Sequence, residues 1–375
     1  MAAKPSSSDH HSPPALPSSP TDLAAVRLYV QSSPLFPQLG LEFENLTDTV
    51  VAKWGHHVEI LCEFLTLKSS SLDATEADRV YRYYLPTYLW CVVQIELHRE
   101  HKIEKIKISG SGQLVSGALV IGLTAPQGCG KTTLAAALSF CLAKNKFKVA
   151  NLSIDDVYLT GKEQEKLATE SHPNNALLKF RGNAGTHDVK LAVDTLKKLK
   201  NSDGNSGNVK IPLPRYDKTA RNGRGDRASV DQWPVVNNPV DVVLFEGWML
   251  GFTPVGADEE IKKIHADLKS VDERLRRDGY DEVHSLIDDW LVIKVDDFAW
   301  VKQWRLQQEQ ASRVAGYDTL TDEQVADFVQ RFMPAYDLYA RRMYTDGPWR
   351  GRDGDASEKH NSVFTVQIDR NRRVV

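Results

Sequence analysis

The stretch TAPQGCGKTT, residues 124–133, has the composition of a phosphate-binding loop. The apolar run GALVIGL (117–123) precedes it and LAAALSFCLAK (134–144) follows it, which predicts a strand, a loop and a helix in succession. Glycines in such a loop let backbone N–H groups converge on an anion at the start of the helix. We expect the phosphates of a nucleoside triphosphate to bind here, at Ala125, Pro126, Gln127, Gly128, Cys129, Gly130, Lys131, Thr132 and Thr133.

Two side chains of the loop suggest its chemistry. Lys131 can reach the β- and γ-phosphates, and Thr132 offers a hydroxyl to Mg²⁺. Ala125 replaces the first glycine of the pattern G-x-x-x-x-G-K-[ST], but alanine is the smallest substitute. The alternative, a glycine-rich turn that binds nothing, is disfavoured because strand, loop and helix agree. Cys129 is either a thiolate favoured by the helix N-terminus or a small residue that fits the loop.

Composition limits the class of protein. A chain of 375 residues predicts one large α/β domain with additions, or two domains. The 47 basic and 50 acidic residues give a net charge of −3 without a basic block, so nucleic-acid binding has no electrostatic support. The four cysteines form no C-x-x-C pair and predict reduced thiols in an intracellular protein. The longest apolar stretch, residues 84–97, is too short to span a membrane.

Three regions follow one another along the chain. Residues 1–20 are rich in Ser, Pro and His and predict a disordered tail, without a signal-peptide core or the Arg-rich character of a transit peptide. Residues 21–105 show helical apolar spacing and predict a helical N-terminal layer, with Pro86 as a kink or break. We expect this layer to pack on the sheet. Residues 106–375 form the nucleotide-binding domain.

The third region alternates strands and helices, which indicates a mainly parallel sheet between helices. Near-continuous apolar runs suit strands that are covered on both faces. Residues 201–208 are predicted to form a surface turn, and the basic, glycine-rich segment 219–234 a loop on the substrate side. The predicted strands are 117–123, 148–154, 241–246, 290–295 and 363–368.

Acidic residues stand where two of these strands end, and ligands of open α/β sheets bind beyond the carboxyl ends of strands. Asp155 and Asp156 follow the strand at 148–154, and Glu246 ends the run DVVLFE. We assign the chemistry to Asp155, as acceptor of a hydroxyl proton or as a magnesium ligand, and a capping role to Asp156. The reverse assignment, with Asp156 as the base, stays open. Glu246 is expected near Mg²⁺ or its waters, so the expected metal site comprises Thr132, Asp155 and Glu246.

Basic and aromatic side chains gather in three further segments, residues 179–188, 211–218 and 300–313. A guanidinium binds a carboxylate through two parallel hydrogen bonds, so the arginines of the first two segments suit a small acid. Arg305 lies on the amphipathic helix predicted at 300–313, either as a lid residue for the transferring phosphoryl group or as a surface cation. The substrate-binding candidates are Asp155, Tyr158, Arg181, His187, Arg215 and Tyr216.

The motifs APQGCGKTT, SIDDVYL, RGNAGTHD, PRYDK, GRGDRA, LFEGWMLGF and WRLQQE together resemble the plant-type D-glycerate 3-kinases. These belong to a wider group of P-loop kinases with uridine kinase, phosphoribulokinase and bacterial pantothenate kinase. The resemblance runs from about residue 80 to the C-terminus. It implies a P-loop kinase fold, ATP and Mg²⁺ as cofactors, and Lys131, Asp155 (general base), Glu246 (Walker B acid) and Arg305 (lid helix) as catalytic residues.

The resemblance implies ATP-dependent phosphorylation of D-glycerate to 3-phospho-D-glycerate, as in photorespiration. The alternatives are another small acceptor, such as a nucleoside, pantothenate or a sugar phosphate, a GTPase switch and a purely structural ATP binder. The switch would need an N-K-x-D element, which the sequence lacks. The expected partners are ATP and D-glycerate, without nucleic acid or membrane. Plant members carry a transit peptide, so the expected location is the chloroplast if one has been removed or omitted, and otherwise the cytoplasm. The sequence does not fix the oligomeric state.

Overall fold

The computed structural model describes residues 14–42, 46–109, 115–203, 209–314, 316, 321–349 and 362–375. The chain divides into two compact units, Met1–Trp90 with Arg373–Val375, and Cys91–Arg372. The tail predicted for residues 1–20 lies mostly outside the described residues, as does most of the surface turn predicted at 201–208. Among the residues described, no helix combines the length and apolar character that a membrane crossing requires.

The first unit is helical, as its apolar spacing predicts. Polar caps begin three of its described helices: the Asp22 side chain accepts from the Ala25 N–H, the Thr47 side chain accepts from the Val50 N–H, and Asp73 forms a capping box with Glu76. The sequence placed the domain boundary at residue 105, whereas the units part after Trp90, inside one uninterrupted helix that gives no compositional signal. The helices are α1 (Leu23–Gln31), η1 (Phe36–Leu39), α2 (Asp48–Leu65), α3 (Ala74–Ala77), η3 (Asp78–Tyr84) and α4 (Leu85–Ser109).

The chain stays helical at Pro86, where the sequence predicted a kink or a break. It is the second residue of α4, which follows directly on the π-helical segment η3. The Leu85 N–H bonds the Val80 carbonyl, one residue further back than in an α-helix. Proline lacks an N–H, and its ring clashes with the preceding turn of a regular α-helix. Next to a wider π-helical turn the backbone hydrogen bonds are already shifted by one residue, so a proline there removes fewer of them.

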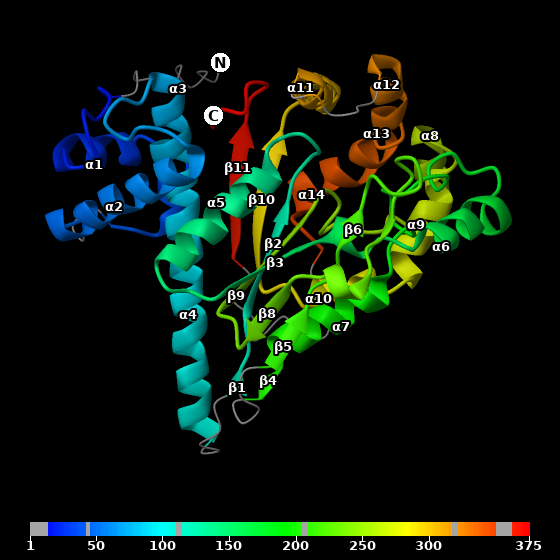
Figure 1. Ribbon diagram of the computed structural model, residues 1–375, viewed down its shortest axis with the longest axis horizontal. Coiled ribbons are helices and arrows are strands. Elements are labelled where there is room, and N and C mark those ends of the chain that lie inside the picture. The colour runs from blue at the N-terminus through cyan, green and yellow to red at the C-terminus, as the bar shows by residue number, and fades with distance from the viewer. Residues whose placement is uncertain are drawn as a thin grey trace, which may run out of the picture. The chain divides into compact units, whose positions relative to one another are not determined.

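The second unit contains a five-stranded sheet in the order β11-β10-β2-β9-β3, and all its neighbouring strands are parallel (Figure 1). All five strands predicted from the sequence are confirmed. β2 is buried along its whole length, as expected of a strand covered on both faces. The strands are β2 (Leu119–Thr124), β3 (Val149–Ser153), β9 (Val242–Gly247), β10 (Asp289–Val295) and β11 (Val363–Ile368).

Helices cover both faces of this sheet, so the predicted three-layer α/β fold is confirmed. α5 (Lys131–Lys144) contacts β2, β3 and β9, and Figure 1 shows α7, α10 and α14 on the other side. The predicted helix at 300–313 is α11. The helices not yet given bounds are η4 (Ile154–Val157), α6 (Gly161–Lys166), η5 (Leu167–Ser171), α7 (Val189–Lys200), η6 (Val230–Gln232), α8 (Asp258–Ile264), α9 (Leu268–Arg277), α10 (Tyr280–Ser285), α11 (Trp300–Val314), α12 (Asp322–Gln330), α13 (Met333–Ala335), η7 (Tyr336–Ala340) and α14 (Arg341–Asp346).

Three small antiparallel pairs stand apart from the main sheet. The pair β6–β7 matters most for the site, because it brackets residues 218–225, which include the first part of the segment 219–234 that the sequence predicted as a substrate-side loop. The pairs are β1 (Val115–Ser116) with β4 (Ser202–Asp203), β5 (Val209–Pro212) with β8 (Val235–Asn238), and β6 (Tyr216–Asp217) with β7 (Asp226–Arg227).

The centre of the sheet leaves no room for a side chain at Gly122. A Cβ there would lie 2.9 Å from Ile287 Cγ2 and 3.0 Å from two ring carbons of the fully buried Trp290. Gly122→Ala should therefore lower the free energy of unfolding by about 1–3 kcal/mol, measured by urea denaturation. Trp290→Leu in the same chain should relieve the clash, so the double variant should lose less than the sum of the single losses. Strict additivity would contradict this account of the contact.

Candidate active site

The register of two parallel strands places the phosphate loop beside an acidic side chain. Leu123 of β2 pairs with Glu246 of β9, and Thr124 pairs with Gly247. The loop begins with the Ala125 N–H donating to the Gly247 carbonyl at 3.3 Å. The loop and Glu246 therefore meet at the carboxyl edge of the sheet, where ligands of open α/β sheets bind.

The phosphate loop is held by backbone conformation and by three distant segments. Gly128 has a φ of +77°, and a Cβ on it would lie 2.7 Å from Trp304 Cβ of α11. The Tyr336 hydroxyl accepts from the Gln127 N–H at 3.0 Å, and Arg372 Nε donates to the Gly128 carbonyl at 2.9 Å. These last two contacts could not be predicted, because Tyr336 and Arg372 are far from the loop in the sequence and belong to none of the recognised motifs.

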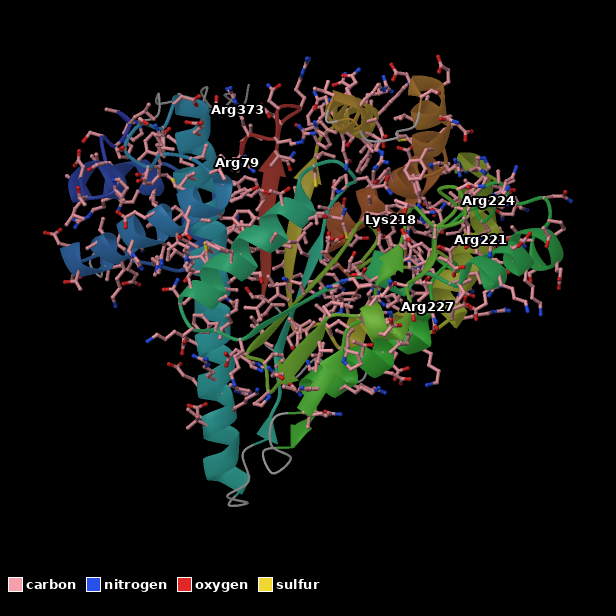
Figure 2. The ribbon with its side chains drawn as sticks, in the orientation of Figure 1. Arg79, Lys218, Arg221, Arg224, Arg227 and Arg373 are labelled. Atoms are coloured by element: carbon pink, nitrogen blue, oxygen red, sulfur yellow. The ribbon has the colours of Figure 1, made fainter. Side chains whose placement is uncertain are left out.

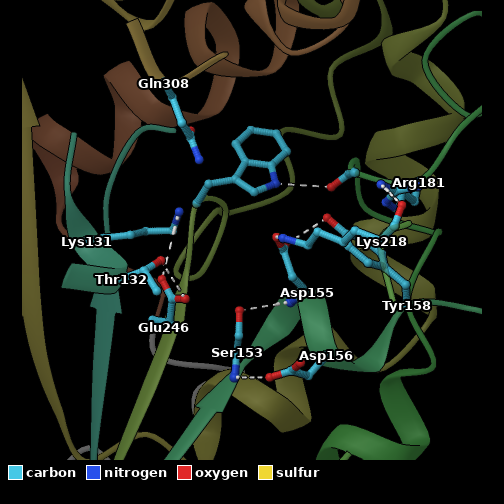
Figure 3. Close-up of polar contacts among 12 residues, drawn as sticks. Lys131, Thr132, Ser153, Asp155, Asp156, Tyr158, Arg181, Lys218, Glu246 and Gln308 are labelled. Carbon is cyan, nitrogen blue, oxygen red and sulfur yellow. Dashed lines mark hydrogen bonds and ion pairs between the residues drawn. The ribbon is translucent and has the colours of Figure 1, made fainter. Parts of the chain in front are cut away.

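Lys131, Thr132 and Glu246 come together at the start of α5. The Thr132 hydroxyl donates to Glu246 Oε1 at 3.1 Å, and Lys131 Nζ lies 3.8 Å from Glu246 Oε2 (Figure 3). Burial works against the charged ammonium, but Glu246 and then Asp155 hold the pKa of Lys131 above its ordinary value. Lys131 is therefore a cation over the physiological pH range, available to phosphate oxygens.

Asp155 accepts two hydrogen bonds just beyond β3. Lys218 Nζ donates to its Oδ2 at 2.7 Å, and the Tyr158 hydroxyl donates to its Oδ1 at 2.8 Å (Figure 3). Burial alone would raise the pKa of Asp155, but the Lys218 ammonium and then Lys131 lower it well below the ordinary range. Asp155 is thus an ionised carboxylate on the side of the site that faces the β6–β7 loop.

Asp156 has a different environment from its neighbour. Its carboxylate accepts from the Ser153 N–H at 3.3 Å, as part of a capping box, and from Arg215 Nη1 at 3.0 Å. Burial outweighs the arginine and raises the pKa of Asp156. The side chain of Asp156 is therefore engaged in holding η4 and Arg215, which is the capping arrangement that the sequence analysis assigned to it.

The predicted acceptor residues Tyr158, His187 and Tyr216 form one aromatic cluster. Tyr158 stacks on His187 with ring centroids 4.6 Å apart and meets Tyr216 edge-on at 5.3 Å. His187 Nδ1 lies 2.8 Å from the Tyr280 hydroxyl, while its buried Nε2 has no hydrogen-bond partner within the part of the chain that the structure describes. Burial lowers the pKa of His187 to about 4, so the imidazole is neutral.

Arg181 and Arg215, which the sequence analysis proposed as ligands of a small acid, both donate hydrogen bonds to other groups of the protein. Arg181 donates to the backbone carbonyls of Gly223 and Arg224, and at 3.4 Å to that of Lys218. Arg215 donates to Asp156 and, at 2.8 Å, to the Pro214 carbonyl. Each guanidinium therefore already has partners within the protein.

The helix α11 packs on the phosphate loop but turns Arg305 along its own surface. Arg305 pairs with Glu309 at 2.5 Å and lies 5.3 Å from the centre of the Phe328 ring. Gln308, which the sequence analysis did not single out, extends from α11 toward Lys131 (Figure 3). Its place in the motif WRLQQE was the signal that could have identified it.

Cys129 is a buried thiol and not a thiolate. Its side chain is 2% exposed, and burial raises its pKa to about 11 despite the neighbouring Lys131. The less reactive of the two sequence interpretations, a small residue that fits the loop, agrees with this environment.

The donor set suits Mg²⁺ only if bound phosphate and water complete it. Among the described residues, no cluster of three or more His, Cys, Asp or Glu side chains is placed to hold a metal ion. A threonine hydroxyl beside one carboxylate is present, and none of the described residues hydrogen-bonds the buried Glu246 Oε2. Mg²⁺ keeps several waters and takes few protein ligands in nucleotide sites, so these residues fit it.

Comparison with known families places residues 120–347 within the model of the phosphoribulokinase / uridine kinase family. The matched region begins in β2 and includes the phosphate loop, Asp155, Glu246 and α11.

Several known proteins are similar to this chain in sequence or in structure. It is 41% identical over 347 residues to a chloroplastic D-glycerate 3-kinase of Arabidopsis thaliana, covering 92% of this chain and 72% of the relative. An uncharacterised kinase of Schizosaccharomyces pombe is 36% identical, covering 59% of this chain and 80% of the relative. The solved structure of a D-glycerate 3-kinase from Cryptococcus neoformans is 30% identical with a TM-score of 0.60, over 75% of this chain and 97% of that one.

The pairing of Arg215 with Asp156 yields a stability prediction. Arg215→Ala and Asp156→Asn should each destabilise the protein, and the double-mutant cycle should show a coupling of about 0.5–3 kcal/mol in the free energy of unfolding. The reason is that each variant leaves its half-buried partner without a counter-charge. No coupling, together with a raised KM for the acceptor alone in Arg215→Ala, would instead make Arg215 an acceptor ligand.

Proposed function

The chain belongs to the phosphoribulokinase / uridine kinase family and is a kinase, and we propose that it transfers the γ-phosphoryl group of ATP to the 3-hydroxyl of D-glycerate. The product would be 3-phospho-D-glycerate. The observation that carries the proposal is the phosphate loop with Lys131 facing an ionised Asp155 across the carboxyl edge of the sheet. The names of the Arabidopsis and Cryptococcus relatives support the choice of acceptor.

Residues 125–133 bind the triphosphate in this proposal. Their backbone N–H groups and the start of α5 face the phosphates, and Lys131 contacts the charge that develops on the transferring group. Thr132 and Glu246, with Asp155 nearby, would hold Mg²⁺, which supplies positive charge against the phosphate oxygens when bound. Gln308 of α11 extends toward Lys131 (Figure 3), and in this proposal Gln308 and Arg305 would close over the phosphates.

Asp155 is the general base in this proposal. It takes the proton from the 3-hydroxyl as the oxygen forms its bond to phosphorus, while the bond between the γ-phosphorus and the bridging oxygen breaks and ADP leaves with that electron pair. Tyr158 and Lys218 orient the carboxylate through their hydrogen bonds. The aromatic cluster of Tyr158, His187 and Tyr216 forms one wall of the acceptor site and keeps water out.

A second candidate keeps the same scaffold but accepts another small anionic alcohol, of the pantothenate or sugar-phosphate type. The cations Arg181, Arg215 and Lys218 favour an anionic acceptor over a neutral nucleoside. An ADP-coupled assay with ATP, Mg²⁺ and a panel of D-glycerate, L-glycerate, pantothenate, ribulose 5-phosphate and uridine decides between these acceptors. Turnover of D-glycerate with the highest kcat/KM is expected, and preference for any other acceptor would overturn the proposal.

We also propose a cellular compartment, again from the name of a relative. The chloroplastic name of the Arabidopsis relative favours the chloroplast, and the reaction favours a place in photorespiration. The cytoplasm is the alternative.

Lys131→Ala should lower kcat by more than tenfold while the protein stays folded. The ammonium stabilises phosphate charge in the transition state, and a tenfold loss corresponds to about 1.4 kcal/mol. Steady-state kinetics and circular dichroism measure the two effects. Lys144→Ala, which removes an exposed lysine from the other end of α5, is the matched control and should behave like the wild type. A kcat above a tenth of the wild-type value for Lys131→Ala would contradict the phosphate-loop assignment.

Asp155→Asn should lower kcat by roughly a hundred- to ten-thousandfold with little change in the ATP dissociation constant. The variant keeps the size of the side chain but removes the charge that accepts the proton. Asp156→Asn is the matched control, and nucleotide titration with steady-state kinetics on both variants supplies the measurement. A large kcat loss in Asp156→Asn with weakened Mg·ATP binding in Asp155→Asn would exchange the two roles. A kcat within about threefold of the wild type for Asp155→Asn would exclude it as the base.

A further inference from the structure

The basic side chains on the acceptor side of the site have different hydrogen-bond partners within the protein. Arg181 donates to loop carbonyls, Arg215 to Asp156 and Arg227 to Asp188 at 2.9 Å. The proposed reaction does not use these partner groups, so the three arginines can stay bound to them throughout. The cations are therefore committed to structure before any substrate arrives.

Lys218 is paired with a group that the reaction must use. Its Nζ lies 2.7 Å from Asp155 Oδ2, and its side chain is 56% exposed while that of Asp155 is 25% exposed. An ammonium has three donors, so it can bind a second anion without releasing the first. The Lys218 ammonium therefore contacts the carboxylate of the proposed base and is at the same time accessible to a ligand.

The backbone that carries Lys218 is fixed by Arg181. We define the acceptor loop as residues 218–225, and Arg181 donates to three carbonyls of this loop, those of Lys218, Gly223 and Arg224. Gly225 has a φ of +80°, and a Cβ there would lie 2.4 Å from the Tyr216 ring. This close packing fixes the backbone of the acceptor loop and therefore the position from which the Lys218 side chain extends. Figure 2 shows Lys218 on the side of the loop nearer the sheet and Arg221 and Arg224 further out.

We propose that Lys218 is the residue that selects an acid as the acceptor, by binding the carboxylate of D-glycerate while that acceptor's 3-hydroxyl approaches Asp155. The inference rests on the proposed function. In a three-carbon acid only two carbon–carbon bonds separate the carboxylate carbon from the carbon that bears the 3-hydroxyl. One ammonium in contact with Asp155 is therefore within reach of the carboxylate of the same small molecule. A neutral acceptor offers no such second anion.

The test compares a charged and an uncharged acceptor. Lys218→Met should lower kcat/KM for D-glycerate by about ten- to a hundredfold, the value of a hydrogen bond between charged groups. With glycerol, which has a hydroxymethyl group in place of the carboxylate, the same variant should lower kcat/KM by a smaller factor, because both acceptors lose the contact that orients Asp155 but only D-glycerate loses a contact to its own carboxylate. If glycerol turnover is below detection, its inhibition constant against D-glycerate serves as the measure of its binding.

Arg224→Met is the matched control, because it removes one exposed positive charge from the same loop without touching the contact to Asp155. It should leave both acceptors and the ATP dissociation constant unchanged. Lys218→Gln, which keeps a polar side chain, and the thermal midpoint of each variant guard against a folding defect. Equal losses with D-glycerate and glycerol, or no loss with D-glycerate, would overturn the role of Lys218. Absence of D-glycerate turnover in the wild type would instead overturn the proposed function itself.

Discussion

The parallel register between β2 and β9 is the constraint on which the site depends. It pairs Leu123 with Glu246, and β3 adds Ser153 to the same row, so the phosphate loop, Glu246 and Asp155 begin from one edge of the sheet. A slip of one residue would turn the Glu246 side chain to the opposite face of the sheet. Lys131 would then lose its counter-charge, and the carboxylate would be buried among apolar side chains.

The site balances its charges before any substrate binds. Each of three carboxylates beyond the strands has a cation from another segment: Lys131 for Glu246, Lys218 for Asp155 and Arg215 for Asp156. An unpaired buried charge costs several kcal/mol, so the fold needs these pairs in its resting state. Substrate phosphates then compete for Lys131, which already lies where they must bind. The same groups therefore serve first as a condition of folding and then as binding groups.

The sequence predicted the strands and the acids that follow them, because both show in the apolar pattern. It did not predict which groups the charged side chains would bind. The five strands were predictable because their apolar runs are buried only in a sheet covered on both faces, and the acids at 155 and 246 because they follow those runs. The partners of Arg181 were not predictable, because they are backbone carbonyls, which every residue carries whatever its side chain. Nor could the sequence show that Tyr336 and Arg372 support Gln127 and Gly128, because helix and turn residues so distant carry no mutual pattern.

The order in which the chain is made bears on how this fold is reached. β10 has β2 on one side and β11 on the other, and residues 296–362 separate β10 from β11. During translation one edge of β10 stays open until residues 363–368 emerge from the ribosome, and an open edge invites pairing with another chain. Arg372, which bonds the Gly128 carbonyl, emerges later still. The Gly128 carbonyl thus gains this partner only after β11 has been made, and the unpaired edge of β10 is available to other chains until then.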